Sequence, residues 1–224
     1  MPYLLESTSE NRYVNPASKL IIGANVGDYL EYKGYGLAGN IGDSYRILAN
    51  KSGFSNYLLV GPEGVNLNID GTDYTFSSGY VQPLLSEVFV VRIAKISLTV
   101  FEAFLNGISI GQVITPSGTK FETDQFFTVA SRAVLGLRGG SYYLEVCTNG
   151  TGLATNRWEN TTGTGSEWID QIAGNNAIQM GAWPTDDSEW VYYPPGTPAG
   201  PNTPINLSVT DLLATSARLN WEQG

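Results

Sequence analysis

Acidic side chains near the end of the chain are the first groups that could do chemistry. Asp186, Asp187 and Glu189 lie close together, and glycoside hydrolysis requires a pair of carboxyl groups. They follow Pro184 and surround Ser188, a composition typical of a solvated turn. The sequence therefore predicts that these carboxylates are hydrated, and it predicts no catalytic residue.

Sugar recognition is a second chemistry that the residues allow. It needs a flat aromatic ring for the apolar face of the sugar, and amides or carboxylates for the hydroxyl groups. Residues 142–193 are rich in both. Trp158 and Trp183 lie among turn residues, so we expect them to be exposed, and Asn160 and Asp186 are the polar candidates. The alternative is that these aromatic side chains close a hydrophobic core.

A third pattern resembles calcium ligands. Oxygen-bearing side chains recur at Asn66, Asn68, Asp70 and Asp73. A helix–loop–helix calcium loop would begin with Asp and supply a bidentate Glu at its twelfth position, whereas Asn66 stands first here and Ser77 twelfth. A β-hairpin accounts for the same residues without metal. A calcium site formed across loops stays open, so metal binding is unknown and no other cofactor is expected.

Composition excludes several classes of protein. The 224 residues contain no histidine and one cysteine, Cys147, which removes Ser-His-Asp and Cys-His catalysis, imidazole-based zinc sites and internal disulfides. The net charge is −9, with 12 basic and 21 acidic residues. This balance argues against nucleic acid or an anionic membrane as a partner. No apolar run is long enough to insert into a membrane, and the N-terminus does not resemble a secretory signal.

The elements that must position these side chains are short strands. Runs at 28–32, 55–60, 87–94, 125–130 and 141–146 alternate or are apolar, with turn residues between them. A short helix is expected at 168–173, ending at Gly174. Many antiparallel strands of this length indicate a two-sheet sandwich.

Two hairpins are marked by turn residues. Asp70-Gly71 predicts the facing pairs Ile69/Thr72, Leu67/Tyr74 and Val65/Phe76, with one apolar and one polar face. Asn106-Gly107 predicts the pairs Leu105/Ile108, Ala103/Ile110 and Val100/Val113. Both faces of this second hairpin are apolar, so we expect it to lie between layers.

Composition also predicts the domain boundaries. Residues 1–19 are polar and are interpreted as an arm or lead-in strand, and residues 20–193 as one β domain. Residues 194–204 hold five prolines and should form an extended linker. Two alternating stretches then occupy residues 205–224.

The run Val90–Gly111, with its Leu-Asn-Gly hairpin, resembles the concanavalin A-like, or laminin G-like, jelly-roll superfamily. The lead-in at 27–32 and the Gly-Thr-Gly…Gly-Asn-Asn stretch at 158–176 are similar to elements of such domains. The resemblance implies an all-β, two-sheet antiparallel jelly-roll sandwich over residues 20–193. Glycosidases of this superfamily carry a Glu-x-Asp-x-x-Glu strand, which this chain lacks, so the resemblance implies a non-enzymatic protein.

The tail, Pro201–Trp221, resembles the first two strands of a fibronectin type III domain. That domain needs about seven strands, so we interpret 205–224 as a partial domain. The resemblance implies a spacer module in an extracellular or virion-surface protein.

Three functions remain open. The first is a non-enzymatic virion-surface protein, a phage tail or head appendage whose lectin-like domain attaches to glycans or builds the particle. Its partners would be other virion proteins or glycans, and a homo-oligomer is expected. The second is a carbohydrate-binding or adhesion module of a secreted or cell-surface bacterial protein. The third is a glycoside hydrolase or lyase, against which the missing motif and missing histidines argue.

Overall fold

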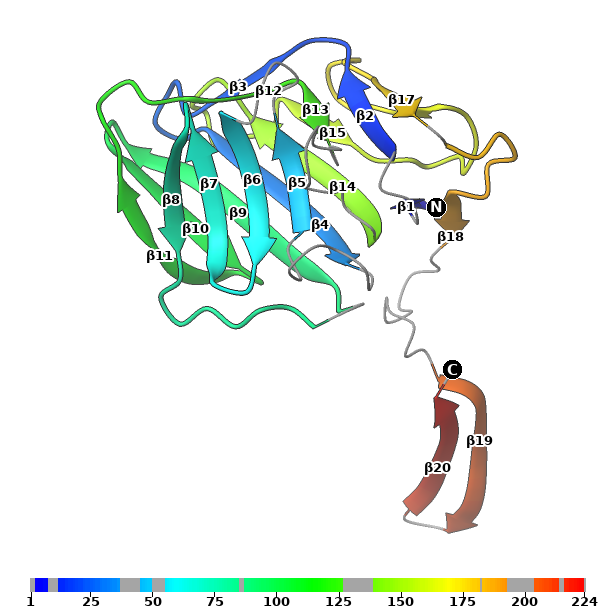
Figure 1. The fold of residues 1–224 in the computed structure, drawn as a ribbon. Helices are drawn as coiled ribbons and strands as arrows, with labels where there is room; N and C mark the ends of the chain where they lie inside the picture. Colours follow the sequence, from blue (N-terminus) through cyan, green and yellow to red (C-terminus); the bar gives the residue numbers. More distant parts are fainter. Residues whose placement is uncertain are drawn as a thin grey trace.

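The computed structural model describes residues 3–7, 12–36, 45–49, 55–84, 87–126, 139–181, 183–192, 204–213 and 216–223. Every regular element among them is a β-strand (Figure 1). No helix in these ranges is long and apolar enough to cross a membrane. Two eight-stranded antiparallel sheets dominate, and we name them sheet 1 and sheet 2.

Sheet 1 has the order β11-β10-β9-β4-β14-β1-β18, and β15 also pairs with β14. Its strands are β1 (Tyr3–Ser7), β4 (Tyr29–Gly36), β9 (Phe89–Ser97), β10 (Val100–Leu105), β11 (Ile108–Ile114), β14 (Gly139–Cys147), β15 (Asn156–Trp158) and β18 (Trp190–Tyr192).

Sheet 2 has the order β16-β17-β2-β13-β5-β6-β7-β8. Its strands are β2 (Arg12–Pro16), β5 (Tyr45–Ala49), β6 (Asn56–Gly61), β7 (Gly64–Ile69), β8 (Thr72–Phe76), β13 (Gln125–Phe126), β16 (Glu167–Trp168) and β17 (Ala177–Gly181). A small pair joins β3 (Leu20–Ile22) to β12 (Phe121–Thr123).

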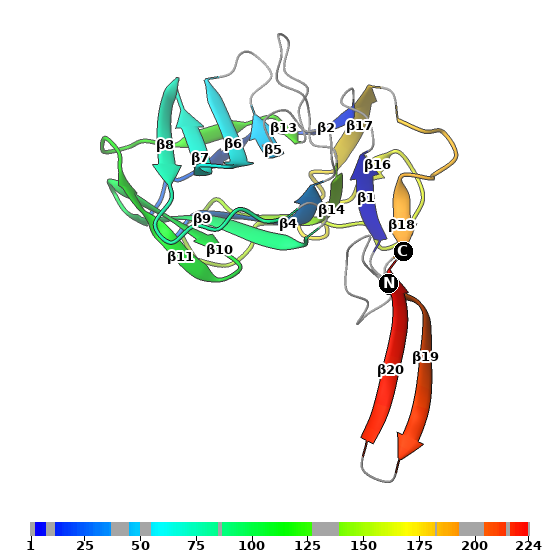
Figure 2. The same ribbon diagram turned by 60° about the horizontal axis from the view of Figure 1, so that its bottom comes forward.

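The two sheets stack as two layers, as Figure 2 shows from the side. Buried hydrophobic side chains from both sheets form one core between them. Strand β9 illustrates the sequence logic: Phe89, Val91 and Ile93 are buried, whereas the residues between them are only partly covered. This period-two burial is what a strand with one core-facing side must have. Large aromatic side chains fill the core between β13 and β15. There the ring centres of Phe126 and Trp158 lie 4.9 Å apart in an edge-on arrangement. The predicted all-β jelly-roll sandwich is confirmed.

Four of the predicted strands, at 28–32, 55–60, 87–94 and 141–146, fall largely within β4, β6, β9 and β14. In the fifth, Gln125–Phe126 forms β13, and residues 127–130 lie outside the described residues.

The Asp70-Gly71 hairpin has the predicted register. Ile69 faces Thr72, Leu67 faces Tyr74 and Val65 faces Phe76 across β7 and β8. Both turn residues have positive φ, 50° and 82°, which is what this two-residue turn requires.

The Asn106-Gly107 hairpin begins as predicted, with Leu105 facing Ile108, but its register then shifts. Ala103 faces Gly111, not Ile110, and Val100 faces Ile114, not Val113. An extra residue in β11 causes the shift, and Gly111 at φ 118° lies where it occurs, as at a β-bulge. The predicted position between layers is also wrong, because β11 is the edge of sheet 1 and Ile114 is 79% exposed.

The predicted helix at 168–173 is wrong. Residues 167–168 form β16, Asp170 makes a bridge to Trp158, and a turn follows. Trp168 and Asp170 are buried while Ile169 is half-buried, so the period is that of a strand.

The chain ends also contain strands. Residues 3–7 and 12–16, inside the segment interpreted as an arm or lead-in strand, pair within sheets 1 and 2. In the tail, β19 (Pro204–Leu213) pairs with β20 (Ser216–Gln223) as an antiparallel hairpin. The domain boundaries and the fibronectin type III assignment stay predictions.

Candidate functional site

The outer face of sheet 1 carries a tripeptide that occurs on two adjacent strands. Tyr29-Leu30-Glu31 lies on β4 and Tyr143-Leu144-Glu145 on β14. The leucines point into the core, where both are buried, so each tyrosine and glutamate lies on the opposite, outer face. The register places Glu31 directly opposite Glu145.

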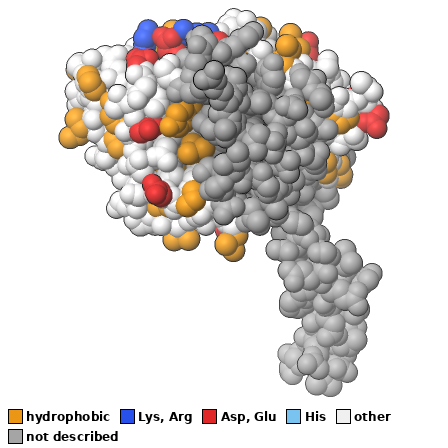
Figure 3. All heavy atoms as spheres, viewed as in Figure 1, with side chains coloured by type: hydrophobic (Ala, Val, Ile, Leu, Met, Phe, Trp, Pro, Cys, Tyr) orange, Lys and Arg blue, Asp and Glu red, His pale blue; other side chains and the backbone are white. Residues whose placement is uncertain are grey.

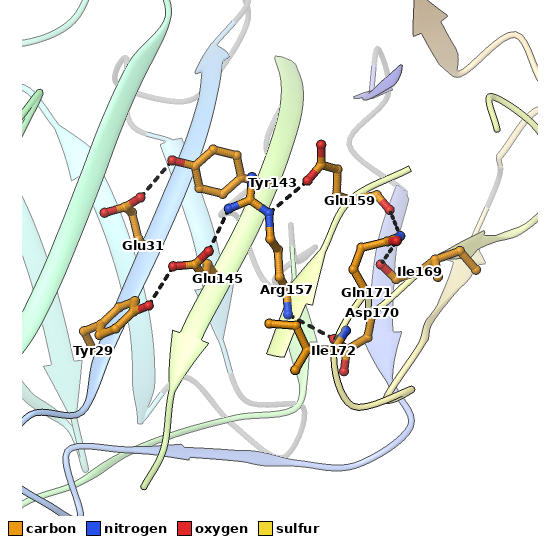
Figure 4. Close-up of polar contacts among 10 residues, drawn as sticks. All are labelled: Tyr29, Glu31, Tyr143, Glu145, Arg157, Glu159, Ile169, Asp170, Gln171 and Ile172. Atoms are coloured by element: carbon orange, nitrogen blue, oxygen red, sulfur yellow. Dashed lines mark hydrogen bonds and ion pairs between the residues drawn. The ribbon is translucent and has the colours of Figure 1, made fainter. Parts of the chain in front are cut away.

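The tyrosines cross between the strands (Figure 4). Tyr29 Oη donates a hydrogen bond to Glu145 Oε1 at 2.6 Å, and Tyr143 Oη donates one to Glu31 Oε1 at 2.8 Å. Each carboxylate is therefore held by the tyrosine of the other strand.

Two arginines complete the pattern. Arg92 on β9 pairs with Glu31 at 3.4 Å and lies 3.8 Å from the centre of the Tyr29 ring. Arg157 on β15 pairs with Glu145 at 2.7 Å and lies 4.2 Å from the centre of the Tyr143 ring.

These contacts form a closed cycle, which we call the six-residue ring. Its members are Tyr29, Glu31, Arg92, Tyr143, Glu145 and Arg157. Cation–π stacking and charge-assisted hydrogen bonds are both stronger when partly shielded from water. The ring thus fixes the side chains across four strands of the outer face.

The ring tyrosines are protected from ionisation. Burial raises the pKa of Tyr29 above its ordinary value, and the hydrogen bond to Glu145 raises it further. Burial and the hydrogen bond to Glu31 likewise raise the pKa of Tyr143. Both phenols therefore act as hydrogen-bond donors and not as bases at neutral pH.

The two opposed glutamates do not have the freedom of a catalytic pair. Both oxygens of Glu31 are engaged, by Tyr143 and Arg92, and both oxygens of Glu145 by Tyr29 and Arg157. A glycosidase needs one carboxyl group to deliver a proton and the other to attack or to activate water. This geometry makes the ring a rigid support.

A pocket opens beside the ring, over β9 and β10. Its volume is about 730 Å³, and it is lined by Glu31, Val90, Arg92, Ala94, Ile96, Phe104, Asn106 and Gly107. Most of its wall is apolar and is formed by alternate residues of β9 and by the Phe104 ring of β10. Arg92 and Asn106 add polar groups to this wall. This size and composition suit a small-molecule ligand. The opposite side of the sandwich, the outer face of sheet 2, shows only scattered hydrophobic side chains among its described residues (Figure 3).

Trp158 and Asn160, two of the sequence-predicted sugar ligands, are fully buried. The Trp158 indole N–H donates to the carbonyl of Asn175 at 2.7 Å. Asn160 Oδ1 accepts the N–H groups of Thr162 and Gly163, both at 2.8 Å. The predicted exposure of Trp158 is therefore wrong. Its ring lies in the core, and its indole N–H is hydrogen-bonded to the backbone of the loop that contains Asn175.

Trp183 and Asp186, the other two predicted ligands, lie on the loop before β18. Trp183 is partly buried and packs against the core, whereas Asp186 is exposed. Asp186 Oδ1 accepts the N–H of Ser188 at 3.2 Å, and hydrogen bonds from Ser188 lower the pKa of this carboxyl. A sugar-binding role for this pair stays a prediction.

The neighbouring acids do not form a shared site with Asp186. Asp187 accepts the N–H of Gly165 at 2.8 Å, and buried Glu189 accepts the amide of Gln179 at 2.9 Å. The prediction that all three carboxylates are hydrated is wrong for Glu189.

The calcium-like pattern of β7 and β8 forms hydrogen bonds within the hairpin. Asn68 Nδ2 donates to Asp73 Oδ1 at 2.7 Å, and Asn68 Oδ1 accepts the N–H of Gly71 at 3.1 Å. Across the described ranges, no three His, Cys, Asp or Glu side chains gather into a possible metal site. Calcium binding stays open.

Sequence reasoning missed the outer face of sheet 1, although a signal for it is present. The identical Tyr-Leu-Glu tripeptides lie in two stretches that the sequence predicts to be strands. What the sequence does not disclose is that these two strands are neighbours, because more than a hundred residues separate them.

No protein-family profile and no curated protein sequence matches the chain. Among solved structures, a candidate carbohydrate binding protein from Bacteroides ovatus superposes with a TM-score of 0.51 at 11% identity, over 76% of this chain. The chain spans only 58% of the length of that protein.

Two further structures share less of the geometry. A pentraxin from Limulus polyphemus has a TM-score of 0.44 at 11% identity, covering 81% of this chain and 89% of its own. A carbohydrate binding module from Bacillus subtilis has a TM-score of 0.38 at 9% identity, covering 63% and 87%. At these identities the likeness shows the jelly-roll sandwich fold and nothing more.

Proposed function

We propose that the chain is a carbohydrate-binding module and that its saccharide ligand occupies the pocket over β9 and β10. The observation that carries the proposal is the wall of that pocket. An aromatic ring, Phe104, lies beside the hydrogen-bonding groups of Arg92 and Asn106 in an open space of about 730 Å³. A sugar presents an apolar face and polar edges, and a wall of this kind complements both.

The six-residue ring supports the proposal by holding the pocket floor in place. Glu31 and Arg92 belong to both the ring and the pocket lining. Binding to a preorganised surface loses less conformational entropy, so a rigid floor favours affinity. The same engagement of the carboxylates supports binding without catalysis.

This proposal corresponds to the second of the three functions that the sequence left open. The jelly-roll fold shared with the Bacteroides ovatus protein supports it. A virion-surface location, a homo-oligomeric state and virion partners stay predictions, as does a cell-surface location.

Binding of the full chain to a panel of immobilised neutral and acidic polysaccharides tests the proposal, with Phe104→Ala as the diagnostic variant. We expect binding to at least one polysaccharide. Removing the Phe104 side chain should lower the affinity roughly tenfold, equivalent to about 1.4 kcal/mol. Leu153→Ala is the matched control, because Leu153 is 73% exposed and is not among the residues that line the pocket. Failure to bind any saccharide, or binding unaffected by Phe104→Ala, would overturn the proposal.

A further inference from the structure

Each side-chain acceptor atom of the pocket already takes one hydrogen bond. Glu31 receives the Tyr143 hydroxyl on one oxygen and Arg92 on the other. Asn106 Oδ1 accepts the backbone N–H of Val90 at 2.8 Å. A ligand donor must therefore share an acceptor that is already engaged.

Donors are what the pocket still offers. Arg92 uses Nη1 toward Glu31, at 3.4 Å, and its side chain is 38% exposed. Its Nε and Nη2 groups, and the Nδ2 group of Asn106, have no partner among the described residues of the chain. Guanidinium and amide N–H groups donate and cannot accept, so the complementary ligand group is an acceptor.

Charge disfavours an anionic acceptor. The guanidinium of Arg92 is paired with Glu31, and a further carboxylate, Glu102, lies beside Phe104 on β10. The whole chain carries a net charge of −9. Lys33 lies opposite Val90 on β4, with its ammonium group 5.1 Å from the centre of the Tyr142 ring, so a further cation lies near the pocket. The carboxylates of Glu31 and Glu102 and the net charge still favour an uncharged ligand group over an anionic one.

Apolar side chains surround the same donors. Val90, Ala94 and Phe104 line the pocket with Arg92 and Asn106. The ligand group should thus combine an uncharged acceptor with a small apolar part. An acetamido group has both, a carbonyl oxygen and a methyl group.

We propose that the pocket is specific for 2-acetamido sugars. The acetamido carbonyl accepts hydrogen bonds from Arg92 and Asn106, and the methyl group packs against Val90 and Phe104. This inference rests on the proposed carbohydrate-binding function. A hydroxyl at the same position lacks the methyl group and so loses the contact with the apolar wall.

Calorimetric titration of the full chain with four trisaccharides tests the inference. The ligands are the trimers of N-acetylglucosamine, of glucosamine and of glucose, all with the same β-linkage, and a uronic acid trimer. We expect the N-acetylated trimer to bind at least tenfold more tightly than the other three. Equal affinities, or preference for the uronic acid, would overturn the acetamido specificity and leave the proposed function standing. If none of the four trisaccharides binds, and no immobilised polysaccharide of the panel binds either, the proposed function itself is overturned.

Asn106→Gly is the variant that assigns the contact. Glycine tolerates the backbone of this turn, where Asn106 has φ 51°, so the hairpin should persist while the amide is lost. We expect the preference for the N-acetylated trimer to shrink at least threefold. Gly107 stays in place, and Ser109→Ala on the same hairpin is the control, because its hydroxyl binds Glu102 and it does not line the pocket. An unchanged preference in Asn106→Gly, with the fold intact by circular dichroism, would contradict the inference.

Discussion

Glu31 on β4 and Glu145 on β14 lie directly opposite each other across an antiparallel strand pair. Like charges in this arrangement destabilise a sheet. Their side chains are only 20% and 18% exposed, so water screens them incompletely. Each is instead compensated by one arginine and by the tyrosine of the other strand. The repulsion between the glutamates is thus offset by contacts that depend on both strands, which ties β4 to β14 more specifically than backbone pairing does.

Removal of one crossing hydroxyl tests this coupling. Tyr143→Phe deletes the donor to Glu31 and keeps the ring that stacks on Arg157. We expect the free energy of unfolding to fall by about 1–2 kcal/mol, near the lower end for hydrogen bonds to charged groups because solvent reaches both partners. Urea denaturation measures it.

A double-mutant cycle separates coupling from simple loss of a bond. In a Glu145→Gln background Glu31 no longer faces a charge, so Tyr143→Phe should cost at least about 0.5 kcal/mol less. Tyr57→Phe, which removes a hydroxyl donor to Asp73 on the hairpin of sheet 2, should add independently to Glu145→Gln. Additivity of the Tyr143 and Glu145 changes would refute the coupling.

Alkaline pH should weaken the fold through the same tyrosines. The folded state raises the pKa of Tyr29 and Tyr143, first by burial and then by hydrogen bonding to a carboxylate. A raised folded pKa stabilises the protein below the unfolded value of about 10, and this contribution is lost as pH rises through the folded pKa. Unfolding free energies from about pH 8 to about pH 11 should therefore fall. The fall should be smaller in Tyr29→Phe/Tyr143→Phe, and an identical pH dependence would contradict the assignment.

Local patterns predicted much of the fold, and contacts distant in sequence account for what they missed. Asp70-Gly71 determines its own turn, so the register of β7 and β8 follows from adjacent residues. In the second hairpin the bulge near Gly111 alters the register, and nothing in the alternation of β10 reveals it. The helix expected at 168–173 failed because Asp170 bonds to the backbone of Arg157 and Asn175, contacts that helical periodicity does not include.

The candidate site shows the same limit. The turn residues around Trp158 predict an exposed side chain, yet its ring packs against Phe126, which belongs to a strand distant in the sequence. The pocket wall combines β4, β9 and the β10–β11 turn. That these residues share a face can be recognised only when the sheet order and the register are known. Neither can be derived from a single sequence.

Asp170 should be the main acid-sensitive group of the loops beside β15. It accepts hydrogen bonds from the N–H groups of Arg157, Ile172 and Asn175 and from the amide of Asn156. Burial alone would raise the pKa of Asp170, but these four donors overcome it and hold the pKa below its usual value. A lowered folded pKa stabilises the protein above the unfolded value of about 4, and this is lost as pH falls through the folded pKa.

Asp170→Asn tests that role. We expect it to lower the free energy of unfolding at neutral pH by about 2 kcal/mol, since the amide cannot accept as strongly as the carboxylate, and to flatten the decline below about pH 4. Urea denaturation at several acidic pH values measures both. Asp70→Asn is the control, because Asp70 lies in an exposed turn with φ 50°, which asparagine tolerates. A neutral-pH loss no larger than that of Asp70→Asn would contradict the role of Asp170.

Gly34 is a point at which β4 and β14 approach closely beside the ring. A Cβ atom there would collide with the Tyr32 hydroxyl and lie 2.5 Å from the carbonyl oxygen of Gly140. Tyr32 cannot simply move away, because it is fully buried and its hydroxyl lies 3.0 Å from Ser141 Oγ. We expect Gly34→Ala to lower the free energy of unfolding by about 3 kcal/mol or more, at the upper end for overpacking. Both the Tyr32 side chain and the backbone at Gly140 would have to shift.

Gly71→Ala separates this steric effect from backbone strain. Gly71 has φ 82°, and a methyl group added there would meet no described atom within 4 Å, so its substitution should cost only the strain of a left-handed conformation, about 1–2 kcal/mol. Urea denaturation of both variants measures the difference. Because Gly34 joins the strands that carry Glu31 and Glu145, Gly34→Ala should also weaken saccharide binding, whereas Gly71→Ala should leave it unchanged. Equal losses of stability in the two variants would show that the β4–β14 contact is looser than its geometry indicates.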